Sequence, residues 1–259
     1  MDGTLLDDSG NLPAGFDDII DELKKRDVIF APASGRQYFS LLKLFDKYKD
    51  DFLFVAENGT LVKYQGEEIF SNPMDLNKSL EILKVGEGLN DVLSVFCGKK
   101  DAYILETQNQ PEYLEELGKY FTRNTCVKRF TDVDDVPVKM SFFDKTGKAA
   151  ENIYPHFVKF KSEFQVVLAS DYWTDLTSLG ANKGHAVQNI QKAMNISPDE
   201  CAAFGDYMND VQMLQSVTYS FAMANAHPDL KSFAKYETVS NNEYGVLVGI
   251  KRLIDEGLI

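Results

Sequence analysis

Two alternations of an apolar helix face with a short apolar run open the chain, and they constrain the fold more than any other feature. Apolar residues recur at helical spacing over residues 16–23 and are followed by the apolar run 28–31. The same succession occupies residues 38–45 and 52–56. Helices that alternate with short buried strands favour a parallel sheet flanked by helices. The first part of the chain therefore predicts an α/β fold.

The same pattern returns near the end of the chain. We expect residues 183–194 to form a helix, 201–204 a strand, 210–217 a second helix and 218–223 a further strand. The two ends of the sequence therefore predict one Rossmann-like parallel-sheet core with a large insertion between its parts.

The middle of the chain has a different order, in which helices are interleaved with pairs of adjacent strands. That order is typical of an α+β domain. We expect residues 1–74 and 178–259 to form the α/β core, and residues 75–177 to form an inserted α+β domain. The expected strand pairs are 92–97 with 102–106 and 164–169 with 171–176.

The charge and hydropathy of the chain exclude several kinds of partner. The formal net charge is −13, whereas binding to a nucleic-acid backbone relies on clustered Lys and Arg. No apolar run approaches the roughly 20 residues that cross a bilayer, and the first residues lack a basic region followed by an apolar stretch. We therefore expect a soluble, cytoplasmic protein that binds neither nucleic acid nor a membrane.

The cysteines and histidines are too scattered to indicate a site. Three cysteines suit neither a disulfide framework nor the paired spacing of a zinc site, so we expect reduced core residues. The three histidines are expected to be structural or solvated, and the acidic stretch 131–135 to be a solvated loop. The cysteines and histidines are Cys97, Cys126, Cys201, His156, His185 and His227.

Four short polar segments each lie at the chain start or just after a predicted strand. They are residues 2–4, 34–36, 183–184 and 205–210. Open α/β sheets place ligands beyond the carboxyl ends of their strands, so the four segments can converge on one crevice. Several carboxylates, one hydroxyl, one lysine and backbone N–H groups suit a phosphate dianion beside a hard cation such as Mg²⁺.

The four segments resemble the four sequence motifs of the haloacid-dehalogenase phosphatases. The first motif of that family is Asp-x-Asp-Gly-Thr, so Met1 falls on x and Asp2 on the second aspartate, which is the family's general acid–base. Ser34 matches the phosphate-binding Ser or Thr of the second motif, and Lys183 matches the lysine that holds phosphate and nucleophile together. The resemblance implies a phosphatase that works through an aspartyl phosphate.

The fourth motif, Gly-Asp-x-x-Asn-Asp, is matched by residues 205–210. The resemblance implies that Asp206 binds Mg²⁺ together with the backbone carbonyl of Asp2. It also implies that Asp210 holds a metal-bound water or orients Lys183. The implied phosphate ligands are Ser34, Gly35, Lys183 and Asn209.

Further strings resemble the Cof-type subfamily, whose cap domain is inserted between the second and third motifs. They are residues 55–59 and 220–226. Within that subfamily the resemblance is closest to bacterial sugar-phosphate phosphatases, on the strength of residues 33–38 and the segment around Asn58. A sugar phosphate or a similar small phosphorylated metabolite is therefore the implied substrate. Asp175 and Thr177, near the return from the cap, are equally suited to substrate contact or to a hinge or strand role.

The chain departs from the family motif at its first position. The nucleophilic aspartate would stand just before Met1, on a strand that normally lies at the centre of the sheet. We expect the natural protein to begin about ten residues earlier, which is the length of one strand with its lead-in. If Met1 is the true start, the chain is expected to be inactive as a phosphatase.

Other functions remain compatible with the residues. A phosphomutase uses the same core but moves phosphate within a sugar, and a protein without the nucleophile would bind a phosphate ligand without turnover. A phosphorylation-switched signalling domain shares the acidic cluster but lacks such a cap. Flavin mononucleotide and pyridoxal phosphate remain alternative substrates, since the core recognises only phosphate. The sequence does not predict the oligomeric state.

Overall fold

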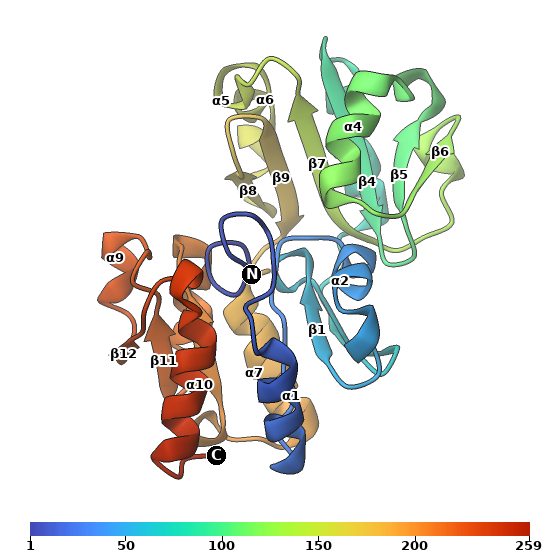
Figure 1. Cartoon of the computed structure of the whole chain (residues 1–259). Helices are drawn as coiled ribbons and strands as arrows, with labels where there is room; N and C mark the ends of the chain where they lie inside the picture. Colours follow the sequence, from blue (N-terminus) through green and yellow to red (C-terminus); the bar gives the residue numbers. More distant parts are fainter. The chain divides into compact units, whose positions relative to one another are not determined.

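The computed structural model describes residues 1–259, and the chain divides into two compact units. The first unit comprises Met1–Ser34, Tyr48–Phe70 and Asn182–Ile259, and the second comprises Gly35–Lys47 and Ser71–Ala181 (Figure 1). Each unit is thus assembled from chain segments that are distant in the sequence. The bounds expected for the inserted cap domain, residues 75–177, stay a prediction.

The first unit contains two separate three-stranded sheets. In one sheet the order is β1-β2-β3, with β1 and β2 antiparallel, and in the other it is β10-β11-β12, with all strands parallel. The parallel sheet among helices confirms the predicted α/β fold class. The strands are β1 (Leu53–Ala56), β2 (Leu61–Tyr64), β3 (Glu67–Ser71), β10 (Ala202–Gly205), β11 (Tyr219–Ala222) and β12 (Tyr236–Glu237).

The helices of the first unit follow the predicted apolar faces. The helix α1 buries Phe16, Ile19, Ile20 and Leu23, as their helical spacing predicts, and it contacts α10 (Figure 1). The helix α7 has the predicted bounds and contacts α8. The helices of this unit are α1 (Phe16–Lys25), α7 (Lys183–Met194), α8 (Val211–Leu214), α9 (Pro228–Lys231) and α10 (Gly245–Asp255).

The strand predicted at residues 28–31 was wrong. Only one isolated parallel bridge, between Ala33 and Val55, follows this run, and Ile29 is exposed. The backbone of this segment hydrogen-bonds β1 on one side, through the carbonyls of Phe30 and Pro32. Proline has no N–H to donate, and no described strand pairs with the segment on its other side, so a ladder does not form.

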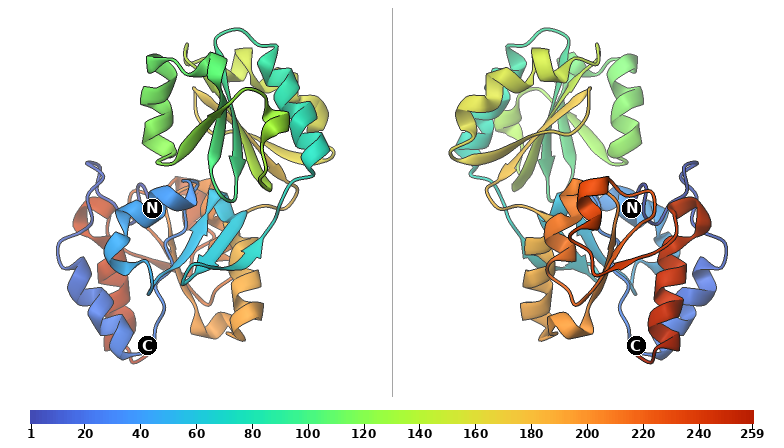
Figure 2. Two further views of the ribbon diagram at one scale, coloured as in Figure 1. Left: turned by 90° about the vertical axis from the view of Figure 1, so that its right-hand side faces the viewer. Right: turned by 90° about the vertical axis from the view of Figure 1, so that its left-hand side faces the viewer.

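The second unit is built on one six-stranded sheet with the order β6-β5-β4-β7-β9-β8 (Figures 1 and 2). The two predicted strand pairs are confirmed, since β4 pairs antiparallel with β5 and β8 pairs antiparallel with β9. The strands are β4 (Val92–Gly98), β5 (Ala102–Leu105), β6 (Asn124–Val127), β7 (Pro137–Asp144), β8 (Phe164–Leu168) and β9 (Trp173–Ser178). The helices are α2 (Tyr38–Leu44), α3 (Leu76–Glu87), α4 (Pro111–Tyr120), α5 (Ala149–Asn152) and α6 (Tyr154–Phe157).

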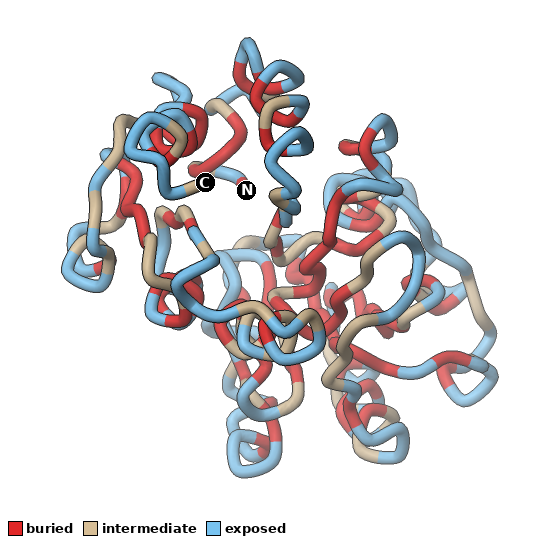
Figure 3. Tube along the Cα trace, turned by 90° about the horizontal axis from the view of Figure 1, so that it is seen from below, coloured by how far each residue is buried: buried red, intermediate tan, exposed pale blue.

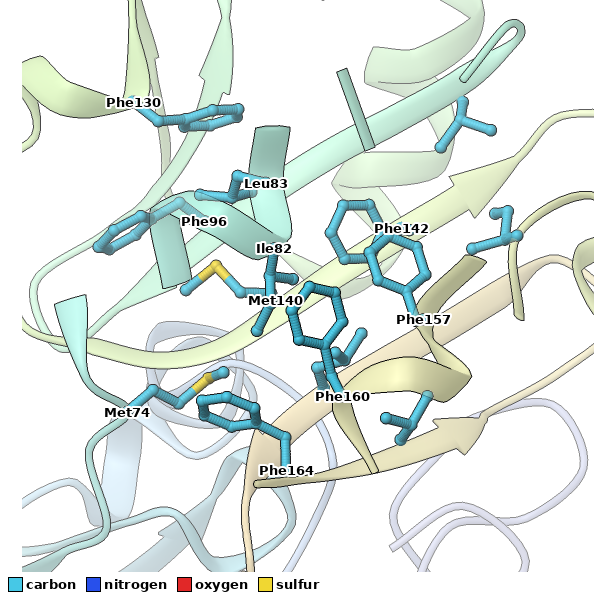
Figure 4. Packing of buried hydrophobic residues seen from close by; sticks show 14 of the residues in the cluster. Met74, Ile82, Leu83, Phe96, Phe130, Met140, Phe142, Phe157, Phe160 and Phe164 are labelled. Atoms are coloured by element: carbon cyan, nitrogen blue, oxygen red, sulfur yellow. The ribbon is translucent and has the colours of Figure 1, made fainter. Parts of the chain in front are cut away.

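Two hydrophobic clusters hold the second unit together. In one, Phe142 of β7 stacks on Phe157 of α6 with ring centroids 4.3 Å apart (Figure 4). In the other, Trp173 of β9 and Phe143 of β7 pack with Leu117 of α4. All residues of β4 and β7 are buried, whereas buried and exposed positions alternate along much of the chain (Figure 3). Burial on both faces explains why these two strands contain so few charged residues.

The segment that contains α2 is hydrogen-bonded to the rest of the second unit by two buried side chains. The amide of Gln37 donates to the carbonyl of Arg123 at 2.9 Å and accepts from its N–H at 3.2 Å. The hydroxyl of Ser40 donates to the carbonyl of Tyr120 at 2.8 Å and accepts from the N–H of Thr122 at 3.1 Å. Four backbone groups of the loop after α4 are therefore satisfied by this segment.

No helix has both the length and the apolar composition that crossing a membrane requires. The three cysteines are free, with Cys97 buried and Cys126 and Cys201 partly buried.

Candidate active site

Three of the four polar segments meet within the first unit through side-chain contacts. The hydroxyl of Thr4, in the first segment, donates a hydrogen bond to a carboxylate oxygen of Asp206. Lys183, the first residue of α7, forms an ion pair with Asp210. Asp206 follows β10, as expected for a site at the carboxyl end of a parallel sheet. Residues separated by up to 202 positions in the sequence are thus brought together.

The ion pair of Lys183 and Asp210 is almost fully buried. Its Nζ–Oδ1 distance is 2.6 Å, and the two residues are 5% and 3% exposed. The other oxygen of Asp210 accepts from the backbone N–H groups of Asp206 at 3.1 Å and Tyr207 at 3.4 Å. Burial raises the pKa of Asp210, but the charge and hydrogen bond of Lys183 outweigh it and lower the pKa. Asp210 therefore stays ionised and fixes the direction of the Lys183 ammonium.

The carboxylate of Asp206 lies in a confined space beside the chain start. A Cβ added at Gly3 would lie 2.5 Å from Asp206 Oδ2, so a side chain there would press on this carboxylate, and the φ of +69° at Gly3 also favours glycine. Burial and the neighbouring charge of Asp210 raise the pKa of Asp206, against the hydrogen bond from Thr4. A partly buried carboxylate that neighbouring groups push towards protonation is one that a bound cation would stabilise.

The amino group of Met1 is buried in the same place. Burial, and next the positive charge of Lys183, lower the pKa of this amine to about 6, while Asp210, Asp206 and Asp2 oppose the change. The backbone nitrogen of Met1 therefore interacts with the same lysine and carboxylates. Asp2 itself is exposed, and its carboxylate acts on the amine electrostatically.

The second predicted segment reaches this unit through Ser34, which is buried. The carbonyl of Ser34 accepts from the N–H of Asn58 at 2.9 Å, and the side chain of Asn58 accepts from the amide of Asn209 at 3.4 Å. Asn58 thereby connects the second and fourth segments. Gly35, which was expected to bind phosphate beside Ser34, is the first residue of the second unit.

Asn58 was not among the predicted site residues, although its segment carried part of the family resemblance. Glu57 and Asn58 both have left-handed backbone angles, with φ of 51° and 56°. Gly59 follows with a φ of 92°, and a Cβ there would lie 2.5 Å from the carbonyl oxygen of Asn182. The tight turn holds Asn58 against the start of α7, and the Asn-Gly pair is its sequence signal.

Two further predicted residues do not belong to the first unit. Asp175 and Thr177 belong to β9 in the second unit, where Asp175 accepts a hydrogen bond from Ser141 at 2.7 Å. No group of three or more His, Cys, Asp or Glu side chains suited to a metal occurs in the chain. Asp206 nevertheless supplies a hard oxygen donor of the kind that Mg²⁺ prefers, and the family motif implies the backbone carbonyl of Asp2 as a second. The residues present therefore fit a magnesium ion that retains several water ligands.

The sequence of this chain matches the family model of the haloacid dehalogenase-like hydrolases over residues 1–250. The chain belongs to this family. Its curated relatives include the 5-amino-6-(5-phospho-D-ribitylamino)uracil phosphatase YbjI of Escherichia coli, which is 29% identical over 98% of this chain and 94% of the relative. Phosphatase YwpJ of Bacillus subtilis is 25% identical over 98% of each chain.

Solved structures agree with this family assignment. The protein SMU.1108c from Streptococcus mutans has a TM-score of 0.83 and 26% sequence identity, covering 98% of this chain and 96% of that one. A HAD/COF-like protein from Plasmodium vivax has a TM-score of 0.82 and 26% sequence identity, covering 98% of this chain and 93% of that one. Together with the family model, this similarity confirms the resemblance to Cof-type members seen in the sequence. By its family and its relatives, this hydrolase is a phosphatase.

Proposed function

We propose that this hydrolase removes phosphate from sugar phosphates or similar small phosphorylated metabolites, that it depends on Mg²⁺, and that it works through an aspartyl phosphate. The observation that carries the proposal is the buried pair of Lys183 and Asp210 beside Asp206. A cation held in a fixed direction next to two carboxylates can neutralise a phosphoryl group without losing free energy to reorganisation. Phosphoryl transfer needs mainly this kind of positioning and charge neutralisation.

Each site residue has a proposed role. Lys183 binds the phosphate and holds it towards the nucleophile, and its direction is kept by Asp210. Ser34, Gly35 and Asn209 donate hydrogen bonds to the phosphate oxygens. Bound Mg²⁺, held by Asp206 and the backbone carbonyl of Asp2, would neutralise charge on the transferred group. These roles are proposed from the family motifs and from the contacts of the first unit.

Proton transfer is proposed for Asp2, and nucleophilic attack for an aspartate that precedes Met1. Asp2 would give its proton to the leaving alkoxide and then take one from the attacking water. The position of the nucleophile is proposed from the first family motif, Asp-x-Asp-Gly-Thr, whose first aspartate falls just before Met1.

The substrate class is supported by one relative. YbjI is named as a phosphatase of a compound that carries a phosphorylated ribityl chain, and it is 29% identical to this hydrolase. A polyol or sugar phosphate is therefore the first class of substrate to test.

Phosphate release in Mg²⁺ from a panel of sugar and polyol phosphates tests the proposal. The 259-residue chain is compared with one extended upstream by an aspartate-bearing strand, and with the extended chain carrying Asp206→Asn. We expect turnover only in the extended chain without the substitution. If the two chains that keep Asp206 fold and bind Mg²⁺ but neither turns over, the protein is a phosphate-ligand binder. Phosphate that moves within the sugar, without release, would indicate a phosphomutase.

A further inference from the structure

The six-stranded sheet of the second unit has two edge strands, β6 and β8 (Figure 1). Edge strands present unpaired backbone groups that can add a strand from another chain, and proteins usually protect them with charges, proline or a cover. The two edges of this sheet differ in that protection.

The strand β8 carries no protecting residue. Its sequence is Phe-Gln-Val-Val-Leu, without a charge or a proline, and it is rich in residues that favour strands. Val167 and Leu168 are each 40% exposed. A short, uncharged and partly exposed apolar edge is the kind of strand that pairs with another copy.

The direction of the backbone groups follows from the pairing with β9. The N–H of Ala169 donates to the carbonyl of Trp173 at 2.9 Å, in the same register in which Val167 lies opposite Asp175. Residues of an antiparallel strand alternate between bonding the neighbour and facing away. The N–H and C=O groups of Phe164, Val166 and Leu168 therefore point outward from the sheet.

The strand β6 shows the contrast. Its four residues, Asn124–Val127, are also uncharged, but Arg123 precedes them and Lys128 and Arg129 follow. A second copy that paired there would bring cations against cations in either strand direction. The strand β6 is thus protected by its flanking charges.

We infer that β8 pairs antiparallel with the β8 strand of a second copy of this chain, with Val166 opposite the same residue of its partner. In this register Phe164 lies opposite Leu168, and each pair exchanges both backbone hydrogen bonds. Two exposed residues before β8, Lys161 and Glu163, then lie at the end of the partner strand that is followed by the exposed Asp171. Lys161 thereby meets an opposite charge across the two-fold axis, with Glu163 as a second anion beside it, whereas both ends of β6 carry cations.

The association is expected to be weak. A net charge of −13 on each copy opposes close approach, although β8 itself carries no charge. One added strand from each copy buries less than the roughly 1,000 Å² typical of a stable interface. A dimer that forms only at high protein concentration follows from this.

Sedimentation velocity of the full chain, from micromolar to submillimolar concentration at low salt, tests the inference. We expect the wild-type chain to shift from monomer to dimer across this range. Val167→Lys places a charge on the exposed edge and should keep the chain monomeric, whereas Leu114→Lys, on the exposed side of α4, should dimerise like the wild type. Leu168→Lys provides a second edge variant should Val167→Lys prove unfolded by circular dichroism.

The charge pair tests the register. Lys161→Asp and Asp171→Lys should each weaken the dimer at least severalfold, and the double variant should recover it. A wild-type chain that stays monomeric at every concentration would overturn the inference, as would edge variants that dimerise like the wild type. Open-ended higher oligomers would contradict the two-fold pairing, because a closed dimer leaves no β8 edge exposed.

Discussion

The two units reach stability in different ways. The second unit is closed by one continuous six-stranded sheet with a hydrophobic cluster on each face. The first unit has two three-stranded sheets, and its polar residues meet through contacts such as Thr4 with Asp206, 202 positions apart. Both units bury charged side chains, among them Asp135 and Asp144 in the second and Lys183 and Asp210 in the first, but only in the first do such contacts join the polar segments that the sequence singled out. Substitutions in those polar segments should therefore change the site as well as stability, whereas substitutions in the apolar clusters of the second unit should change stability alone.

The largest effect is expected at Lys183. Lys183→Met leaves the buried carboxylate of Asp210 without its cation, and breaking such a pair costs about 3–5 kcal/mol. Phosphatase activity of the upstream-extended chain should fall by about 10²–10³-fold or more. Adding Asp210→Asn should restore part of the unfolding free energy in urea without restoring turnover. Recovery of both together would show that Lys183 acts only through stability.

A comparable loss of stability without loss of site geometry is expected at Phe142. Phe142→Ala removes a ring that is fully buried against Phe157 and should lower the unfolding free energy by about 3–5 kcal/mol. At a temperature where the variant is folded, affinity for Mg²⁺, measured by calorimetry, should equal that of the wild type. A matched change in Mg²⁺ affinity would contradict the separation of the units.

Gly3 provides a sharper comparison inside the first unit. Gly3→Ala and Gly10→Ala both place a side chain at positive φ, 69° and 80°, and each should cost about 1–2 kcal/mol. Only at Gly3 would the new Cβ lie against Asp206, since nothing lies within 4 Å of it at Gly10. We expect Mg²⁺ affinity to fall in Gly3→Ala alone. Equal affinities in the two variants would show that Asp206 can move aside.

The smallest effects are expected at two helix caps. Asp75 caps α3 in the second unit and Asn182 caps α7 in the first, each by accepting a backbone N–H. Asp75→Ala and Asn182→Ala should each lower the unfolding free energy by about 1 kcal/mol. Turnover of the extended chain should fall only in Asn182→Ala, because α7 begins at Lys183. An equal fall in Asp75→Ala would contradict this assignment.

Much of the fold was predictable because it is encoded locally. The apolar spacing of Phe16, Ile19, Ile20 and Leu23 predicted α1, and the pairing of β4 with β5 followed from two adjacent apolar runs. The convergence of Lys183 with the segment after β10 was also predictable, because parallel strands end at one edge of the sheet.

The rest depended on contacts that the local sequence does not encode. The apolar run 28–31 lacks a ladder, since its pairing is decided by segments elsewhere in the chain. The helix expected at 210–217 forms only over the short α8, Val211–Leu214, which follows a 3₁₀ turn at Met208–Asp210. The association of Gln37 with Arg123, 86 positions away, had no local signal.

The membership of α2 in the second unit matters for anyone who would transplant that unit into another protein. A gene fragment covering only residues 75–177 would omit Gln37 and Ser40, and four backbone groups of the loop after α4 would then need water as their partner. The fragment would also lack Phe39, whose ring centre lies 4.7 Å from the guanidinium carbon of Arg123. A transplanted second unit therefore has to combine two separate segments of the chain, Gly35–Lys47 and Ser71–Ala181.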